Sequence, residues 1–376
     1  MPLVAKAQQD RLVYLDAVRG IAALAVLWGH AYLAFGHQYF QPIMRTPLHL
    51  FFDAYAAVTV FFVLSGYVLS VRYLELRRFE SFNIWAFYVK RYCRIVLPFI
   101  AVLVVSYLAR TWFYQFYADN DPALSKWAQR LWSDKKVDLP PLEYLKSALM
   151  ILPDTKFPLI PQAWTLRIEM GMSLALPFMI LIACRSSWWL VLFTLVFIQL
   201  LGVYVFAAHF TMGILLAKHQ EYIVNLIRSN RLLAIATLVI GVLLLTYRLP
   251  HELIAMKLSP KALRFVTGIG ALMLLAWIMA NARAQAILSI APLQFLGKIS
   301  YSLYLVHLLV MLTVAQPAIH WLNGIGIEGS YSYWLALGIT AAASIIVSSI
   351  CFYLIEQPSI RIGAIISTKI QGARSV

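Results

Sequence analysis

The chain has 376 residues, of which 62% are hydrophobic and 12% are charged, and its formal net charge is +15. A soluble domain carries about 25% charged residues, so the composition excludes an ordinary soluble protein. The hydrophobic residues form long runs separated by short charged segments, a pattern that predicts an all-α integral membrane protein. Because the positive charges lie between the apolar runs, the expected partner is the lipid bilayer and not nucleic acid.

About ten transmembrane helices are expected, within a single transmembrane domain that spans residues 1–376. Lys and Arg gather in alternate connecting segments and near both ends of the chain, so both termini are predicted to be cytoplasmic. The aromatic, basic stretch 81–92 is expected to lie along the inner interface. In the outer loop, 115–161, the stretch 140–152 is expected to form a short helix that either caps an outer opening or lies on the surface. The spans are predicted near 13–36, 48–71, 93–114, 162–184, 187–206, 208–222, 231–248, 262–281, 294–316 and 332–356.

The first span, VYLDAVRGIAALAVLWGHAYLAFG, carries Asp16, Arg19 and His30. Arg19 and His30 are eleven residues apart, which on a helix is about three turns and about 16 Å, so they lie on one stripe. Charges in hydrocarbon are costly, and this stripe is therefore expected to face a polar interior. Snorkelling at the inner edge would explain Arg19 and Asp16, but His30 lies too deep to reach either surface.

Counting residues from the span ends places the other polar candidates at two depths. The deeper set comprises His30, Glu169 and Arg167 in AWTLRIEM, and His307 in GKISYSLYLVH. Tyr304 shares a helix face with His307, and Ser302 lies in the same stretch. The set near the inner ends of the spans comprises Arg19, Arg91, Arg94, Ser65 in FFVLSG, and Glu356 in YLIEQPS.

Together the two sets indicate group transfer from a phosphorylated cytoplasmic donor to a hydroxyl. Guanidinium groups match phosphate oxygens, and a buried histidine beside a carboxylate suits proton removal near neutral pH. Each residue also has a structural interpretation. Arg91 and Arg94 could set topology or bind anionic lipid, Glu169 could pair with Arg167, and His307 could be a core histidine. FFVLSG could be a small-residue packing site.

Six motifs in order resemble the membrane-bound acyltransferase-3 family of bacterial surface-glycan O-acyltransferases, over residues 11 to 361. They are LDAVRGIAALAVLWGH, in which ten residues separate the arginine from the histidine, VFFVLSGYVLS, KRYCR, AWTLRIEM, FLGKISYSLYLVH and FYLIEQPS. The resemblance is to the core domain only. It implies a multi-pass protein of the bacterial inner membrane that uses acyl-CoA, most often acetyl-CoA, as co-substrate, with no metal.

By their match to these motifs, His30 would be the catalytic base and Arg19 its motif partner. Arg91 and Arg94 would bind the donor, and Glu169 would be a functional carboxylate. We expect Glu169 to orient the imidazole of His30. Tyr304, Arg167 or a backbone amide could stabilise the thioester oxygen, and the sequence does not choose among them.

The predicted activity is acyl transfer to a hydroxyl of a carbohydrate or a lipid-linked glycan. The first alternative is a proton-coupled sugar or glycolipid transporter that uses His30 and Glu169 as a relay. The second is a membrane scaffold without catalytic activity, against which the gathering of titratable groups at one depth argues. The sequence does not identify the acceptor, the acyl group or the oligomeric state.

Overall fold

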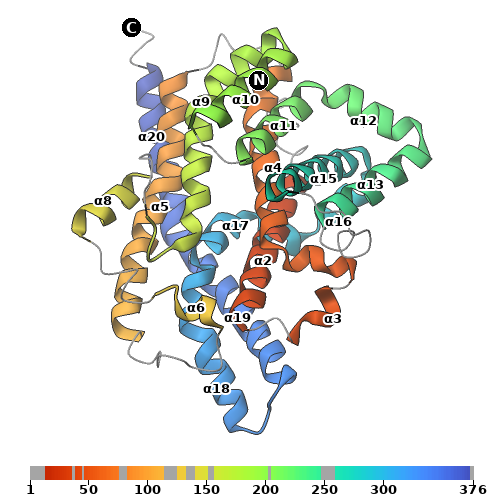
Figure 1. Ribbon diagram of the computed structural model, residues 1–376. Coiled ribbons are helices and arrows are strands. Elements are labelled where there is room, and N and C mark those ends of the chain that lie inside the picture. The colour runs from red at the N-terminus through yellow and green to blue at the C-terminus, as the bar shows by residue number, and fades with distance from the viewer. Residues whose placement is uncertain are drawn as a thin grey trace. The chain divides into compact units, whose positions relative to one another are not determined.

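The computed structural model describes residues 13–35, 39–44, 46–75, 83–113, 125–132, 140–150, 156–201, 205–246 and 259–372. All regular elements in these ranges are helical, as the composition predicts, whereas residues 115–124, 133–139 and 151–155 of the outer loop lie outside the described residues. The principal helices (Figure 1) are α2 (Val13–Phe35), α4 (Ala54–Glu75), α5 (Ile84–Phe113), α6 (Lys126–Gln129), α8 (Pro141–Leu149), α9 (Trp164–Arg185), α10 (Ser187–Leu201), α11 (Phe206–Lys218), α12 (Gln220–Ser229), α13 (Arg231–Leu245), α15 (Pro260–Ala280), α16 (Ala282–Leu288), α17 (Ala291–Val310), α18 (Gln316–Gly324), α19 (Ser330–Cys351) and α20 (Gln357–Gly372).

Within the described residues, seven helices are long and apolar enough to cross a membrane. The number rises to eight if α12 and α13, bent by 113°, form one span. The expected ten is therefore approximate. Helices α10 and α11 contain 15 and 13 residues, fewer than the roughly 20 that a membrane crossing requires. The protein is a multi-pass, all-α membrane protein.

The third predicted span begins earlier than the sequence analysis places it. Helix α5 runs without interruption from Ile84 to Phe113 and is about 45 Å long, whereas the hydrocarbon layer is about 30 Å thick. Asn83 starts it by accepting a hydrogen bond from the backbone N–H of Ala86 over 3.0 Å. The prediction of a separate interfacial segment is therefore wrong for residues 84–92, because no proline or glycine breaks the helix before Cys93.

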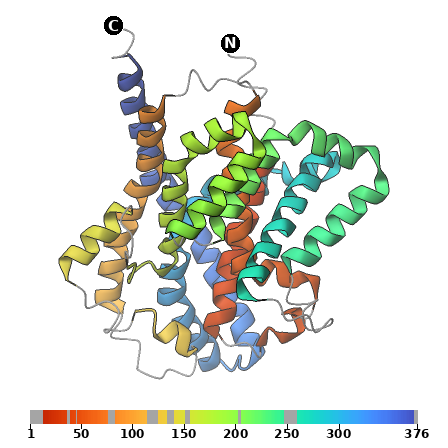
Figure 2. The same cartoon turned by 45° about the horizontal axis from the view of Figure 1, so that its top comes forward.

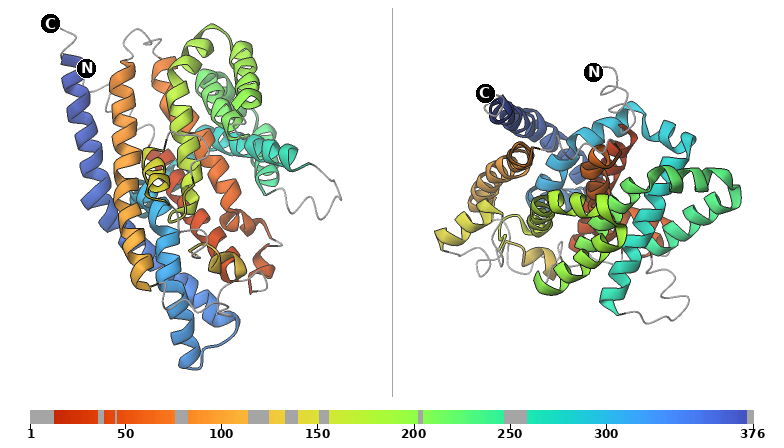
Figure 3. Two further views of the ribbon diagram at one scale, coloured as in Figure 1. Left: turned by 60° about the vertical axis from the view of Figure 1, so that its left-hand side comes forward. Right: turned by 90° about the horizontal axis from the view of Figure 1, so that it is seen from above.

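The last predicted span also continues past its expected end. Helix α19 passes through a π-helical turn, Phe352–Glu356, directly into α20, so one apolar helix runs from Ser330 to Gln371. Helix α20 lies along α5 (Figure 3), where Gly363 allows close approach. A Cβ at Gly363 would lie 2.9 Å from the Cβ of Cys93.

The short helix expected within 140–152 is present as α8. It begins at the second residue of the Pro140–Pro141 pair, where the missing N–H groups do no harm. On its surface Lys146 donates to Glu143 over 2.7 Å, and the ring of Tyr144 meets Tyr107 of α5 edge to face. Its proposed role as a cap over an outer opening stays a prediction.

The chain divides into two compact units, each of which is described by itself. The first comprises residues 1–25, 45–82 and 174–298, and the second comprises residues 26–44, 83–173 and 299–376. Helices α2, α9 and α17 contribute residues to both units.

In the first unit, glycine allows α4 and α11 to pack at very short range. A Cβ at Gly66, in the FFVLSG motif, would lie 2.0 Å from the carbonyl oxygen of Phe210. A Cβ at Gly213 would lie 2.0 Å from the carbonyl oxygen of Val63. The packing interpretation of FFVLSG is therefore confirmed. Elsewhere in this unit α12 and α13 form the bent pair that packs beside α15 (Figure 2).

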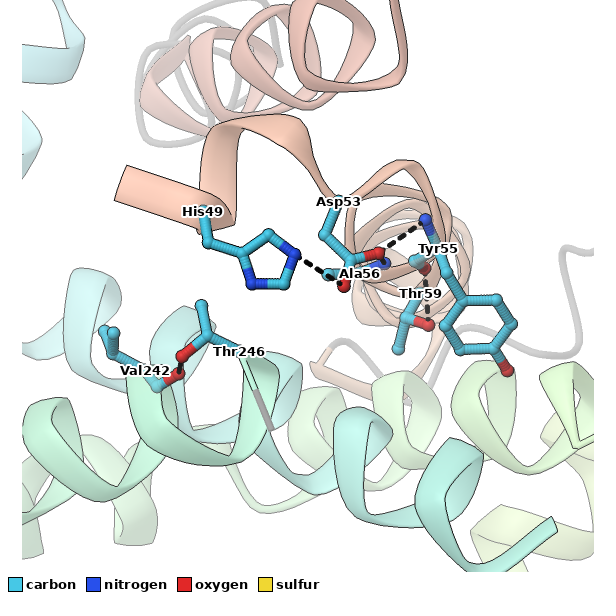
Figure 4. Close-up of polar contacts among 7 residues, drawn as sticks. All are labelled: His49, Asp53, Tyr55, Ala56, Thr59, Val242 and Thr246. Carbon is cyan, nitrogen blue, oxygen red and sulfur yellow. Dashed lines mark hydrogen bonds and ion pairs between the residues drawn. The ribbon is translucent and has the colours of Figure 1, made fainter. Parts of the chain in front are cut away.

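The start of α4 is fixed by Asp53, which sequence reasoning did not single out (Figure 4). One carboxylate oxygen, Oδ1, accepts hydrogen bonds from the backbone N–H groups of Tyr55 and Ala56 over 2.9 and 3.0 Å, as an N-cap does. The other, Oδ2, lies 3.8 Å from Nε2 of the buried His49. The helix therefore begins at Ala54, a few residues after the predicted start near 48.

Candidate active site

Two histidines that the sequence placed at one depth are in direct contact in the second unit. Nδ1 of His30, in α2, lies 2.8 Å from Nε2 of His307, in α17. The planes of the two rings are nearly parallel, with 13° between them and 5.0 Å between the ring centroids. His307 is fully buried and His30 is half-buried. Nδ1 of His307 lies 2.7 Å from the carbonyl oxygen of Tyr304, one turn earlier in the same helix.

A segment of the outer loop covers the ring of His30. Ser125 binds the end of α2, where its N–H donates to Ala34 O over 2.7 Å and its hydroxyl donates to Leu33 O over 2.6 Å. These carbonyls are among the last four of the helix, which have no partner within it. The next element, α6, then brings the indole of Trp127 parallel to His30, with 5.7 Å between the ring centroids and 7° between the planes. Sequence reasoning missed Trp127, because a lone aromatic in a charged loop carries no positional signal.

The hydroxyl of Tyr304 is already bound to protein. It donates to the carbonyl oxygen of Gln162 over 3.0 Å and lies in short contact with the hydroxyl of Thr165. The amide of Gln162 in turn donates to Leu305 O over 2.9 Å. Since a phenol has one proton to donate, Tyr304 is committed to holding the start of α9 against α17 and is a poor donor for a thioester oxygen.

Glu169 contacts an arginine and not a histidine. Its Oε1 accepts from Nη2 of Arg91 over 2.5 Å, and Nε of Arg91 donates to the hydroxyl of Ser173 over 3.1 Å. Side-chain exposure is 12% for Arg91 and 25% for Glu169. The expected contact between Glu169 and His30 is replaced by this ion pair, and the residue that contacts His30 is His307.

One face of α9 links the two groups of residues. Thr165, Glu169 and Ser173 are spaced by four, so they lie on one side of the helix along about 12 Å. Thr165 meets Tyr304 at one end, and Glu169 and Ser173 hold Arg91 at the other. A polar strip therefore runs along α9 from the neighbourhood of the histidines to Arg91.

The second arginine of KRYCR, Arg94, is half-buried and makes no hydrogen bond or ion pair with the described residues. Glu356 is 1% exposed and accepts a hydrogen bond from the buried Ser302 over 2.6 Å. Both Ser302 and Glu356 thus lie inside the second unit, where their bond ties α17 to the π-helical turn after α19.

Three further candidates lie apart from these contacts. In the first unit Arg19 pairs with Asp16 over 2.6 Å within α2, and Ser65 is half-buried beside Gly66 in α4. In the second unit Arg167 is half-buried in α9. The stripe that joins Arg19 to His30 exists, because α2 is one continuous helix from Val13 to Phe35.

Comparison with known families agrees with this architecture. The model of the acyltransferase-3 family, described as an acyltransferase domain, matches residues 12–353. The chain belongs to this family. The match covers nearly the whole chain and confirms the resemblance that the six motifs predicted. The comparisons with curated proteins and with solved structures gave no match. Family and fold together make the protein a membrane acyltransferase, which acts in a lipid bilayer on an acyl donor and an acceptor.

Proposed function

We propose that the protein transfers an acyl group, most often acetyl, from cytoplasmic acyl-CoA to a hydroxyl of a surface or exported carbohydrate or a lipid-linked glycan. The site would lie in the bacterial inner membrane, and His30 would be the general base. The observation that carries the proposal is the contact of His30 with the buried His307 inside the bundle of an acyltransferase. A histidine held in this way can take a proton from a hydroxyl near neutral pH.

The reaction needs one proton transfer in each direction. His30 removes the proton of the acceptor hydroxyl as that oxygen attacks the thioester carbon, and a C–O bond forms. The C–S bond then breaks, and the proton on His30 passes to the departing sulfur of CoA. The products are the ester and the thiol of CoA, and His30 returns to its neutral form.

Arg91 and Arg94 are proposed to receive the phosphates of the donor. Glu169 and Ser173 hold the guanidinium of Arg91 through Nη2 and Nε, which orients its remaining N–H groups. Arg94, one turn further along α5, has its donors unused by the described residues. Two guanidinium groups on one helix suit a polyphosphate. Arg19 is the third candidate for the donor.

The test uses membrane vesicles from cells that carry the gene, supplied with acetyl-CoA radiolabelled in the acetyl group. The expected result is label in the carbohydrate and glycolipid fractions, lowered by about 10²–10⁴-fold in His30→Ala. His320→Ala, which replaces an exposed histidine of α18, is the matched control and should transfer normally. Equal labelling by His30→Ala and the control would exclude His30 as the base. Mass spectrometry of the labelled material would then identify the acceptor.

A further inference from the structure

A chain of hydrogen bonds fixes where the protons lie on the two histidines. The carbonyl oxygen of Tyr304 can only accept, so Nδ1 of His307 must carry the hydrogen of their 2.7 Å bond. In a neutral ring, Nε2 of His307 then has the lone pair and accepts the 2.8 Å bond from His30. Nδ1 of His30 is therefore the protonated nitrogen, and its Nε2 carries the free lone pair.

The surroundings favour this neutral pair. Both histidines lie in helices of membrane-spanning length, and His307 is fully buried. Within the described part of the chain, neither ring contacts a carboxylate, and their ring neighbours are Trp127 and Tyr304. An isolated charge on either ring would have no compensating partner there and would be costly.

We propose that His307 is a positioning residue that holds His30 in the tautomer whose Nε2 accepts the proton of the acceptor hydroxyl. This inference rests on the proposed function of His30 as the base. When Nε2 takes the proton, His30 becomes an imidazolium and its Nδ1–H still points at His307. That hydrogen bond becomes charge-assisted and strengthens as the transition state forms. His307 itself takes no proton, because its own N–H remains bound to the carbonyl of Tyr304.

Two substitutions separate positioning from packing. In His307→Gln, the amide oxygen can occupy the place of Nε2 and accept from His30, whereas the bond to the Tyr304 carbonyl is lost. In His307→Asn, the shorter amide can still donate to Tyr304 but leaves His30 without its acceptor. Both variants remove the ring, and His307→Asn leaves the space of one more methylene empty than His307→Gln. His320→Asn controls for replacing a histidine at an exposed site.

Initial rates are measured in the same vesicles over a range of radiolabelled acetyl-CoA concentrations. The expected result is that His307→Gln keeps kcat within about tenfold of wild type, whereas His307→Asn lowers kcat by about 10²–10⁴-fold. The KM for acetyl-CoA should stay within about threefold in both, because the arginines are untouched. Equal loss in the two variants, or a change in KM alone, would overturn the positioning role.

A second measurement does not depend on activity. Nitrogen NMR of the purified protein labelled with ¹⁵N-histidine distinguishes protonated from unprotonated ring nitrogens, and His30→Gln assigns the signals of His30. We expect an unprotonated Nε2 in wild type and in His307→Gln, and a mixture of tautomers in His307→Asn. A wild-type His30 with an unprotonated Nδ1 would refute the inference. If wild type transfers no acetyl group, the proposed function fails while this measurement still decides the tautomer.

Discussion

Replacing Gly66 by alanine should destabilise the protein by an amount that follows from the contact between α4 and α11. The new Cβ would lie 2.0 Å from a backbone carbonyl oxygen, whereas real Cβ contacts essentially never fall under 3.0 Å. The helices must therefore separate by about 1 Å, because a backbone atom cannot rotate away as a side chain can. Overpacking of this kind costs about 2–3 kcal/mol, and alanine returns about 1 kcal/mol through its higher helix propensity. The net loss should be about 1–2 kcal/mol.

Gly338 provides a matched control in α19. It is exposed, and a Cβ there would meet nothing within 4 Å, so Gly338→Ala should be neutral or stabilising by up to about 1 kcal/mol. The assay heats the purified protein in detergent and follows the monodisperse fraction by size-exclusion chromatography. Gly66→Ala should melt several degrees below Gly338→Ala. Adding Gly213→Ala to Gly66→Ala should destabilise the protein less than Gly213→Ala does alone, because a single separation of α4 from α11 relieves both clashes. Equal melting of Gly66→Ala and Gly338→Ala would show that the close crossing is absent.

Three further predictions test the site. Replacing Arg91 and Arg94 together by glutamine should weaken the binding of CoA measured by calorimetry, and the loss should be larger at low ionic strength. An unchanged affinity would mean that the two arginines only set the topology of the chain. Glu169→Gln should keep kcat within about tenfold in the vesicle assay, because its carboxylate contacts Arg91; a loss of about 10⁴-fold would instead mean that it orients His30. Trp127→Ala should lower the rate of transfer by about tenfold, since an aromatic stack contributes about 0.5–1.5 kcal/mol, and Trp127→Phe should keep most of the rate. Equal rates for Trp127→Ala and wild type would show that the indole has no role.

Hydrophobic runs predicted the class of fold well and the helix ends poorly. A run of apolar residues reports what lies in the bilayer, but a helix continues into water as long as no residue interrupts it. Helix α5 therefore begins at Ile84, nine residues before the apolar run at Cys93, and α19 continues into α20. Conversely, α10 and α11 are apolar but short, and hydropathy alone does not distinguish such short helices from complete membrane spans.

Depth along the spans placed His30 correctly with His307 but placed Glu169 with the histidines, whereas it pairs with an arginine that was expected at the lower level. His30 and His307 were placed at one height and do meet. Glu169 was placed at the same height and contacts Arg91 instead. Contact requires the rotation of each helix about its axis as well as its depth, and one residue changes that rotation by about 100°. Trp127 could not be found in this way, because its position depends on how a loop binds the end of α2.

The separation of carboxylates from the histidines has a chemical consequence. In apolar surroundings a carboxylate in contact with His30 would favour the imidazolium form and so reduce the fraction of the ring that is free to accept a proton. In the second unit the carboxylate of Glu169 is instead neutralised by Arg91, and that of Glu356 is bound by Ser302. The partner of His30 is His307, and in the neutral state that we infer it would orient Nδ1 without adding charge. Arg91 is held in place by Glu169, and under the proposed function the phosphates of the donor would supply the negative charge that Arg94 does not meet among the described residues.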